Sequence, residues 1–244
     1  MRQKKLNIWA LYFVAIMAHL CCLGQDSNDD FAEFEAEFSI DDVEEVYDPF
    51  ISYNKVMYRA NDRLYIHVLK PVTKVYSDLI PLAGRSSVER FFTNILFPLR
   101  FVNNVLQLKL HGASVETGRF LCNTTAGGLG FFDPAFNWCG WLPRNEDFGQ
   151  TLGHYGVGAG PPVVLPFFGQ SNIRDAFSKV PDHFLNPLSY LQPGYVAAGV
   201  KTYDKINFIS VHEAEFDSLR KDALVPYTFF RDAYLQMRNK EIEE

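Results

Sequence analysis

Apolar positions recur at helical spacing along most of the chain, whereas the strict alternation typical of a β-strand is scarce. This pattern predicts helices over residues 51–69, 86–109, 113–124, 203–219 and 226–237. Pro71 is expected to begin a new segment after the first of them, because proline interrupts the hydrogen bonding of a helix interior. Ser86 and Glu89 form a capping-box pattern that predicts the start of the second. The expected fold class is all-α.

The helix predicted over residues 87–109 has two unlike faces. Its apolar arc contains Val88, Phe91, Phe92, Ile95, Leu99, Val102 and Leu106, and its polar arc carries amides such as Asn94 and Asn103. Packing of the apolar arc into a core is favoured over contact with lipid. Pro98 is expected to kink this helix or divide it in two.

A glycine-rich segment follows over residues 127–166. Its four central glycines, Gly153, Gly156, Gly158 and Gly160, are expected to shape backbone turns, because glycine costs about 1 kcal/mol in a helix. A phosphate-binding loop is excluded, since Pro161-Pro162 prevents a helix from following at once. Glu146 and Asp147 are expected to complete one helix N-terminus, and Ser171 to cap another.

The N-terminus has the order of an export signal. Arg2, Lys4 and Lys5 precede an apolar run over residues 6–20, and small residues follow. The run is shorter than the roughly 20 residues of a membrane-spanning helix, so a cleaved signal peptide over residues 1–24 is favoured over a retained anchor.

Two kinds of cleavage compete at the end of this signal. Cys21 and Cys22 stand where a lipoprotein carries its acylated cysteine, which makes both lipid-anchor candidates. Ordinary cleavage after Gly24 is favoured, because His19 and Leu20 are polar or bulky where the small residues of a lipobox stand.

Charge is distributed unevenly over the 244 residues, whose net charge is -6. The stretch from Asp26 to Asp48 holds eleven acids without a lysine or arginine, and residues 25–47 are predicted to form a flexible acidic spacer. A single folded domain is expected over residues 48–244. Neither part has the basic patch of a nucleic-acid-binding protein. Aromatic residues make up 15% of the chain, which suggests that some of them face lipid or a partner.

No catalytic or metal-binding constellation is recognisable. The chain lacks the G-x-S-x-G turn of a serine hydrolase, and the histidine of His212-Glu213 has no second histidine at the zinc-protease spacing. No cofactor is expected. Cys122 and Cys139 form either a disulfide or two free thiols, and the sequence leaves both possibilities open.

Several blocks in a fixed order resemble the MlaA/VacJ family of Gram-negative outer-membrane lipoproteins. They cover nearly the whole body, and the most specific are Asp48-Pro49-Phe50, Glu146-Asp147-Phe148-Gly149-Gln150-Thr151-Leu152-Gly153, Tyr155-Gly156-Val157-Gly158, Arg174-Asp175 and Arg231-Asp232-Ala233-Tyr234. The poor lipobox and the long acidic spacer depart from the family.

The resemblance implies a ring-like helical protein in the inner leaflet of the outer membrane, with an amphipathic pore and an associated trimeric porin. It implies removal of mislocalised phospholipid from the outer leaflet and its transfer to a periplasmic lipid carrier, without catalysis. Such a path avoids exposing acyl chains to water, at about 0.8 kcal/mol per CH₂. The alternative is a periplasmic lipid-modifying enzyme, a phospholipase or an acyltransferase.

Candidate residues for the lipid path or its gate are Tyr58, Asn61, Asp62, Asn94, Asn103, Gly153, Gly156, Gly158 and Gly160. Residues 58–62 are expected to act as a hinge, because Asn61 and Asp62 are poor helix formers inside a helical pattern.

Overall fold

The computed structural model describes residues 46–223 and 225–243. The predicted signal peptide, Cys21, Cys22 and the acidic spacer up to residue 45 lie outside the described residues. Tyr47–Glu244 form one compact unit.

The described chain is mostly helical, as predicted. Its elements are α3 (Ile51–Leu64), the π-helix η2 (Tyr65–Leu69), α4 (Lys70–Leu79), α5 (Leu82–Ile95), α6 (Phe97–Leu106), α7 (Leu110–Thr125), α8 (Pro134–Cys139), α9 (Phe148–His154), β1 (Pro162–Leu165), β2 (Gly169–Asn172), α10 (Ile173–Leu185), the 3₁₀-helix η3 (Pro187–Tyr190), α11 (Gly194–Asp222) and α12 (Pro226–Glu243). The strands form an antiparallel hairpin in which Val163 pairs with Ser171 and Leu165 with Gly169.

Prolines act differently at two predicted breaks. Pro98 divides α5 from α6 at Leu96, as expected, and occupies the first turn of α6. Pro71 was expected to begin a new segment, but the helical backbone continues through it. The backbone N–H of Lys70 bonds to the carbonyl oxygen of Tyr65 five residues earlier. This π-helical turn widens the backbone before Pro71, so η2 leads directly into α4.

Two predicted caps are wrong in position. α5 begins at Leu82 after Pro81, so Ser86 lies inside the helix. The capping-box pattern of Ser86 and Glu89 therefore does not mark the start of the helix. α10 is capped by Asn172, whose side chain accepts the N–H of Asp175 at 2.8 Å, rather than by Ser171. Asp147 does cap α9, since its carboxylate accepts the N–H of Gln150 at 2.8 Å.

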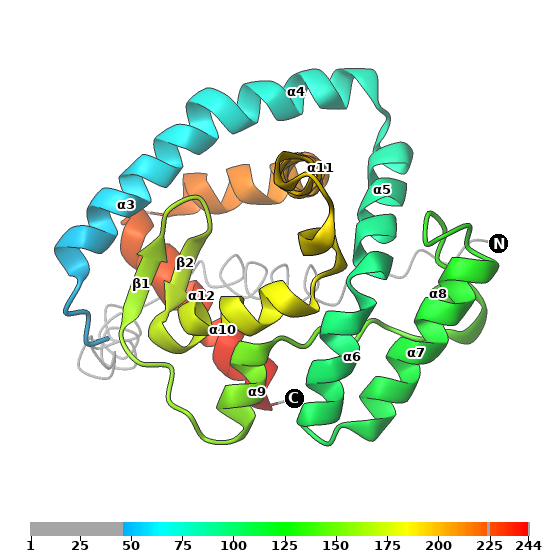
Figure 1. The fold of residues 1–244 in the computed structure, drawn as a ribbon. Coiled ribbons are helices and arrows are strands. Elements are labelled where there is room, and N and C mark those ends of the chain that lie inside the picture. Colours follow the sequence, from blue (N-terminus) through cyan, green and yellow to red (C-terminus); the bar gives the residue numbers. More distant parts are fainter. Residues whose placement is uncertain (1–45, 224, 244) are drawn as a thin grey trace, which may run out of the picture. The chain divides into compact units, whose positions relative to one another are not determined.

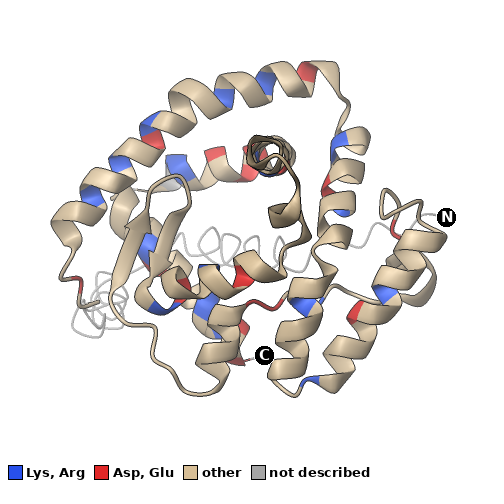
Figure 2. Cartoon of the chain, in the orientation of Figure 1, with Lys and Arg blue, Asp and Glu red and all other residues tan. Residues whose placement is uncertain are grey.

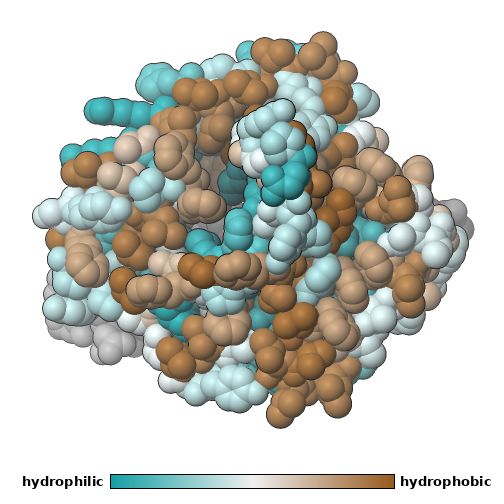
Figure 3. All heavy atoms as spheres, viewed as in Figure 1, coloured by the Kyte–Doolittle hydropathy of each residue, from teal (hydrophilic) through white to brown (hydrophobic). Residues whose placement is uncertain are grey.

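Packing contacts between elements form a closed circuit within this unit. α4 packs on α11, α11 on α5, α5 on α6, α6 on α10, α10 on β1, and β1 on α3, which continues through η2 into α4. Figure 1 shows this ring, with α11 crossing beside its opening. Figure 3 shows a hollow near the middle of the same view, with hydrophobic residues along one side and hydrophilic residues along the other.

The ring is polar inside its packed regions and apolar outside. Buried polar and charged side chains outnumber buried hydrophobic ones among the described residues. On α10, Arg174, Asp175 and Ser178 are buried while Phe177 and Phe184 are exposed.

The apolar arc over α5 and α6 is not the core face that its periodicity predicts. Asn94, Arg100, Asn103, Asn104 and Gln107 of the polar arc are buried, whereas Leu106 of the apolar arc is exposed. Phe92 is the one member of the apolar arc in the buried class. The reason is that the polar arc meets polar or charged partners on α7 and α9. Arg100 donates to Glu116 at 2.7 Å, and both side chains are almost fully buried.

No described helix combines the length and apolar character that a membrane span requires.

Candidate functional site

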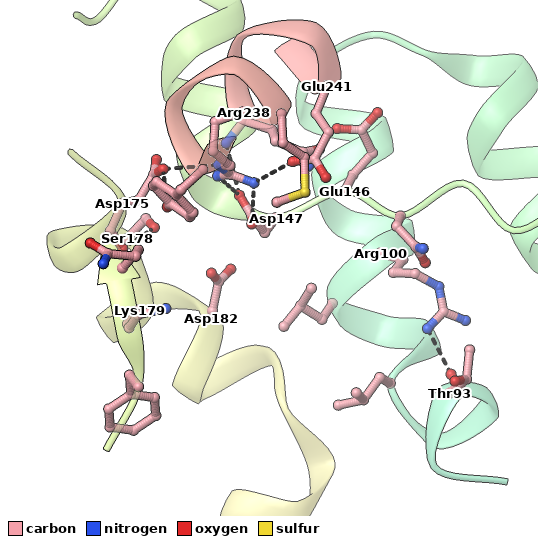
Figure 4. A pocket seen from close by; sticks show the side chains of 18 residues that line it. Thr93, Arg100, Glu146, Asp147, Asp175, Ser178, Lys179, Asp182, Arg238 and Glu241 are labelled. Carbon is pink, nitrogen blue, oxygen red and sulfur yellow. Dashed lines mark hydrogen bonds and ion pairs between the residues drawn. The ribbon is translucent and has the colours of Figure 1, made fainter. Parts of the chain in front are cut away.

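A charged cavity of about 480 Å³ lies between α6, α9, α10 and α12. Figure 2 shows both signs of charge on the helices beside the ring's opening, and Figure 4 shows the side chains that line the cavity. Arg238 on α12 is its central cation. It donates to Asp175 at 2.9 Å, to both oxygens of Asp147 at 2.8 and 2.9 Å, and to Glu241 at 2.9 Å.

Asp175 is the central anion of the same network. Its carboxylate accepts bonds from Arg174 at 2.9 Å, Tyr234 at 2.7 Å and Asn172 at 2.8 Å, in addition to Arg238. Burial raises the pKa of this carboxyl, but the bonds from Arg238, Arg174 and Tyr234 together outweigh burial and lower its pKa to about 2. Asp175 therefore stays ionised and joins α10, α12 and β2 at the cavity wall.

Asp182 on α10 has the opposite environment. Figure 4 shows its carboxylate pointing into the cavity, toward the side where Asp147 and Arg238 lie. Burial, and then the nearby charge of Asp147, raise the pKa of its carboxyl to about 6, despite the bond at 3.0 Å that it accepts from the N–H of Phe148. Lys179, one turn earlier, also lines the cavity, and its ammonium lies 5.7 Å from the ring centre of Phe168. The cavity thus presents both charges to a polar group that enters it.

Two glycines let α9 approach the ion pairs around Asp175 closely. A Cβ atom at Gly149 would lie 2.4 Å from a carboxylate oxygen of Asp175 and 2.7 Å from Arg238. At Gly153 it would lie 2.9 Å from Arg174. Side chains at these two positions would displace the ion pairs, so the glycines of the family block create the space for them.

A second, smaller cavity of about 240 Å³ lies between α3, the hairpin, α11 and α12. It brings together the predicted residues Tyr58, Asn61 and Asp62. Tyr58 stacks on Phe230 with ring centres 6.0 Å apart, and Asp62 forms an ion pair with Arg220. Burial, followed by the charge of Asp62, raises the pKa of Tyr58.

Asn61 joins α3 to the turn of the hairpin. Its amide nitrogen donates to the carbonyl of Leu165 at 2.9 Å, and its oxygen accepts the N–H of Phe167 at 2.9 Å. Asn54 lies two helical turns earlier. Its amide nitrogen donates to the carbonyl of Pro162 at 3.0 Å, and its oxygen accepts the N–H of Val164 at 2.8 Å. Residues 58–62 are regular helix here, and the irregular backbone lies just beyond them in η2. The hinge stays a prediction.

Asn94 and Asn103 are buried and do not border the charged cavity. Asn94 donates to Thr124 at 2.9 Å, and Asn103 accepts from Thr151 at 2.9 Å. Their role in the lipid path stays a prediction.

The remaining glycines shape the loop before β1. Gly156 and Gly160 have φ values of +82° and +68°, which favour glycine, whereas Gly158 has open space around it and no positive φ. The loop is tied to α10 by the N–H of Arg174, which donates to Ala159 at 3.1 Å. It therefore positions the first turn of α10, beside the charged cavity.

Sequence reasoning missed most of the charged cavity. No local motif pointed to Arg238, Asp182, Lys179 or Glu241. Asp147 was identified as part of a helix start and of a family block, without a role in a cavity. Cys122 and Cys139, left open by the sequence, are free thiols. No group of three potential metal ligands occurs among residues 46–223 and 225–243.

The sequence model of the family described as MlaA lipoprotein matches residues 46–241. The chain belongs to this family. It is 35% identical to the intermembrane phospholipid transport system lipoprotein MlaA of Escherichia coli over 78% of this chain and 76% of that protein. The lipoprotein of the same name from Haemophilus influenzae is 30% identical over 80% of this chain and 78% of that protein.

A solved structure from work on the "structural basis for maintenance of bacterial outer membrane lipid asymmetry" has the same fold. Its TM-score is 0.71 at 30% sequence identity, and the match covers 80% of this chain and 99% of that one. The family and helical fold that the sequence blocks predicted are thereby confirmed.

Proposed function

We propose that this protein removes mislocalised phospholipid from the outer leaflet of the outer membrane and passes it to a periplasmic lipid carrier. In this proposal the ring lies in the inner leaflet beside a trimeric porin, and phospholipid passes through its opening without being chemically altered. Relatives named for intermembrane phospholipid transport, and the structural relative linked to outer-membrane lipid asymmetry, support this assignment.

One observation carries the proposal: the amphipathic character of the ring is inverted. Polar side chains pack inside it and border one side of its hollow, while large apolar side chains such as Phe177, Phe184 and Trp138 are exposed on its surface. In water this arrangement is unfavourable, because burying an exposed apolar side chain contributes about 1.5–3 kcal/mol. In a lipid leaflet the outward side chains meet acyl tails, and the polar interior offers the headgroup a path.

Phospholipid at the cell surface is the quantity that tests this function. We expect deletion of the gene to raise outer-leaflet phospholipid, and the wild-type gene to restore it. Lys179→Trp, which places a large side chain in the charged cavity, should restore it poorly. The matched control is Lys74→Trp on the exposed surface of α4. Unchanged surface phospholipid after deletion would contradict the proposal.

Two further measurements address the finer parts of the proposal. Release of fatty acid or lysolipid by the purified protein would show a lipid-modifying enzyme instead. The mass of the mature N-terminus would decide between an acylated Cys21 or Cys22 and ordinary cleavage.

A further inference from the structure

The smaller cavity has an aromatic wall built from four elements. Tyr58 and Tyr65 come from α3 and η2, Phe216 from α11, and Phe230 from α12. The rings of Tyr65 and Phe216 lie 6.4 Å apart, and those of Tyr58 and Phe230 lie 6.0 Å apart. Val164 of β1 completes the apolar surface. Aromatic and aliphatic walls of this kind favour an apolar ligand.

The charges at this cavity are already neutralised. Asp62 and Arg220 are its charged lining residues, and they form an ion pair with each other. The guanidinium also lies 5.1 Å from the ring centre of Tyr65. An anion would have to displace Asp62 to bind there, whereas an uncharged chain would leave the pair intact.

The volume sets the size of the ligand. At about 240 Å³ the cavity is below the roughly 300–1,000 Å³ of sites that enclose a whole small molecule. Apolar cavities of about 150 Å³ stay dry and bind benzene in other proteins. The space therefore suits part of a hydrocarbon chain.

Gln170 connects this cavity with the charged one. It lines both, and its amide nitrogen is buried without a hydrogen-bond partner among the described residues. Buried amide groups are nearly always bonded, so this unpaired donor is free to turn toward an acceptor that a ligand supplies in either cavity. A phospholipid ester carbonyl joins a polar head to an apolar tail, and it is such an acceptor.

We infer that the smaller cavity holds part of one acyl tail of a phospholipid, whose polar end occupies the charged cavity and whose ester carbonyl accepts the N–H of Gln170. This inference rests on the proposed function. It adds a site where the lipid is held on its way through the ring, with tail and headgroup bound in separate chambers on either side of β2.

Photolabelling tests the tail site directly. Purified protein in vesicles is mixed with a phosphatidylethanolamine that carries a diazirine near the end of one acyl tail, and labelled peptides are identified by mass spectrometry. We expect label on the peptides that contain Tyr58, Tyr65 and Phe230. In Phe230→Glu, which puts a carboxylate into the apolar wall, labelling of these peptides should fall about tenfold or more.

The matched control is Leu219→Glu, because Leu219 is exposed on α11 and does not line the cavity, whereas the neighbouring Phe229 packs its ring against Phe230. Its labelling should equal that of the wild type. If Phe230→Glu does not fold, Phe216→Trp reduces the free volume without adding charge and should weaken labelling in the same peptides. Leu219→Trp, exposed on the same helix, is its control.

A diazirine-labelled free fatty acid distinguishes the possible sources of the tail. It lacks the headgroup that the charged cavity would bind, so it should label the same peptides less than the phospholipid does. Labelling by fatty acid alone, label confined to other parts of the chain, or equal labelling of Phe230→Glu and Leu219→Glu would overturn the inference. If deletion of the gene still raises surface phospholipid in that case, the proposed function stands and the tail site does not.

Discussion

Asp182 and Asp175 lie on one helix, yet their environments shift their pKa values in opposite directions. Asp175 accepts bonds from two arginines and a tyrosine, whereas Asp182 faces the cavity near the carboxylate of Asp147. The consequence is a different dependence of folding stability on pH at the two positions. Asp175 stabilises the fold above its unfolded pKa, and this contribution is lost as the pH falls through about 2.

For Asp182 the sign is reversed. Its folded pKa of about 6 is above the unfolded value of 3.8, so the folded state binds more protons between these values, and stability falls as the pH rises through that range. Asp182→Asn keeps an oxygen for the N–H of Phe148 but cannot ionise. We therefore expect its melting temperature, relative to wild type, to increase from pH 5 to pH 7.

The expected gain is on the order of 1 kcal/mol after solvent screening, or about 2–4 °C. Thermal unfolding in detergent at the two pH values measures it. Asp175 contributes equally to folding stability at pH 5 and pH 7, because its folded and unfolded pKa values both lie below pH 5. A constant difference between variant and wild type would show that Asp182 titrates normally.

At the scale of elements, α3 and the hairpin are joined by two asparagines instead of an apolar interface. Asn54 and Asn61 bond the backbone of β1 and of the turn that follows it. This contact closes the circuit of the ring, because α3 leads into α4 at one end and packs on β1 along its other end. Hydrogen bonds of this kind each contribute about 1 kcal/mol, so one end of the contact can open without global unfolding.

Replacing Asn61 should loosen the hairpin turn specifically. In Asn61→Leu the N–H of Phe167 and the carbonyl of Leu165 lose their partner. We expect hydrogen exchange at the Phe167 amide to become about tenfold faster, which corresponds to 1.4 kcal/mol. Exchange at the Val164 amide, held by Asn54, should change less.

Exchange measured by mass spectrometry on peptides of the hairpin gives the result, and Arg59→Ala, exposed on the same helix, is the control. A uniform rise over α3 and the hairpin would instead support the hinge predicted for residues 58–62. Unchanged exchange in Asn61→Leu would mean that the asparagine does not hold the turn.

The sequence predicted helices better than it predicted their orientation. α7 and α12 lie where the periodicity placed them, and Pro98 divides α5 from α6. In the arc of α5 and α6 that should have been the core, Phe92 is buried, Leu106 is exposed and the other members are half-buried, because the polar arc occupies the buried positions. The charged cavity was beyond local patterns, since Asp147, Asp175 and Arg238 come from three helices that meet only in the folded chain.

At the scale of the whole molecule, three turns carry large apolar residues where small or polar ones are usual. Leu108, Leu129 and Phe167 are the non-glycine residues with positive φ in the described chain, at 59°, 64° and 65°. They are 75%, 59% and 76% exposed. An L-residue in this backbone region costs about 1–2 kcal/mol, and asparagine is among the residues that tolerate it best. A leucine that is both strained and exposed is explained if its side chain inserts into lipid.

Leu108, in the turn between α6 and α7, allows strain and lipid contact to be separated. Neighbouring Leu106 and Leu110 are also exposed, and Figure 3 shows a hydrophobic patch over this end of the two helices.

We expect the free energy of unfolding of Leu108→Asn in detergent to exceed that of wild type by about 1 kcal/mol, because the backbone strain is reduced. The variant should therefore unfold at a higher urea concentration. The same variant should bind phospholipid vesicles about tenfold more weakly, since it loses an apolar side chain worth about 1.5–3 kcal/mol in lipid. Leu108→Phe keeps the strain and the apolar contact and should bind like wild type. Co-sedimentation with vesicles, together with urea unfolding, measures both quantities. Equal vesicle binding by Leu108→Asn and wild type would place this turn outside the membrane.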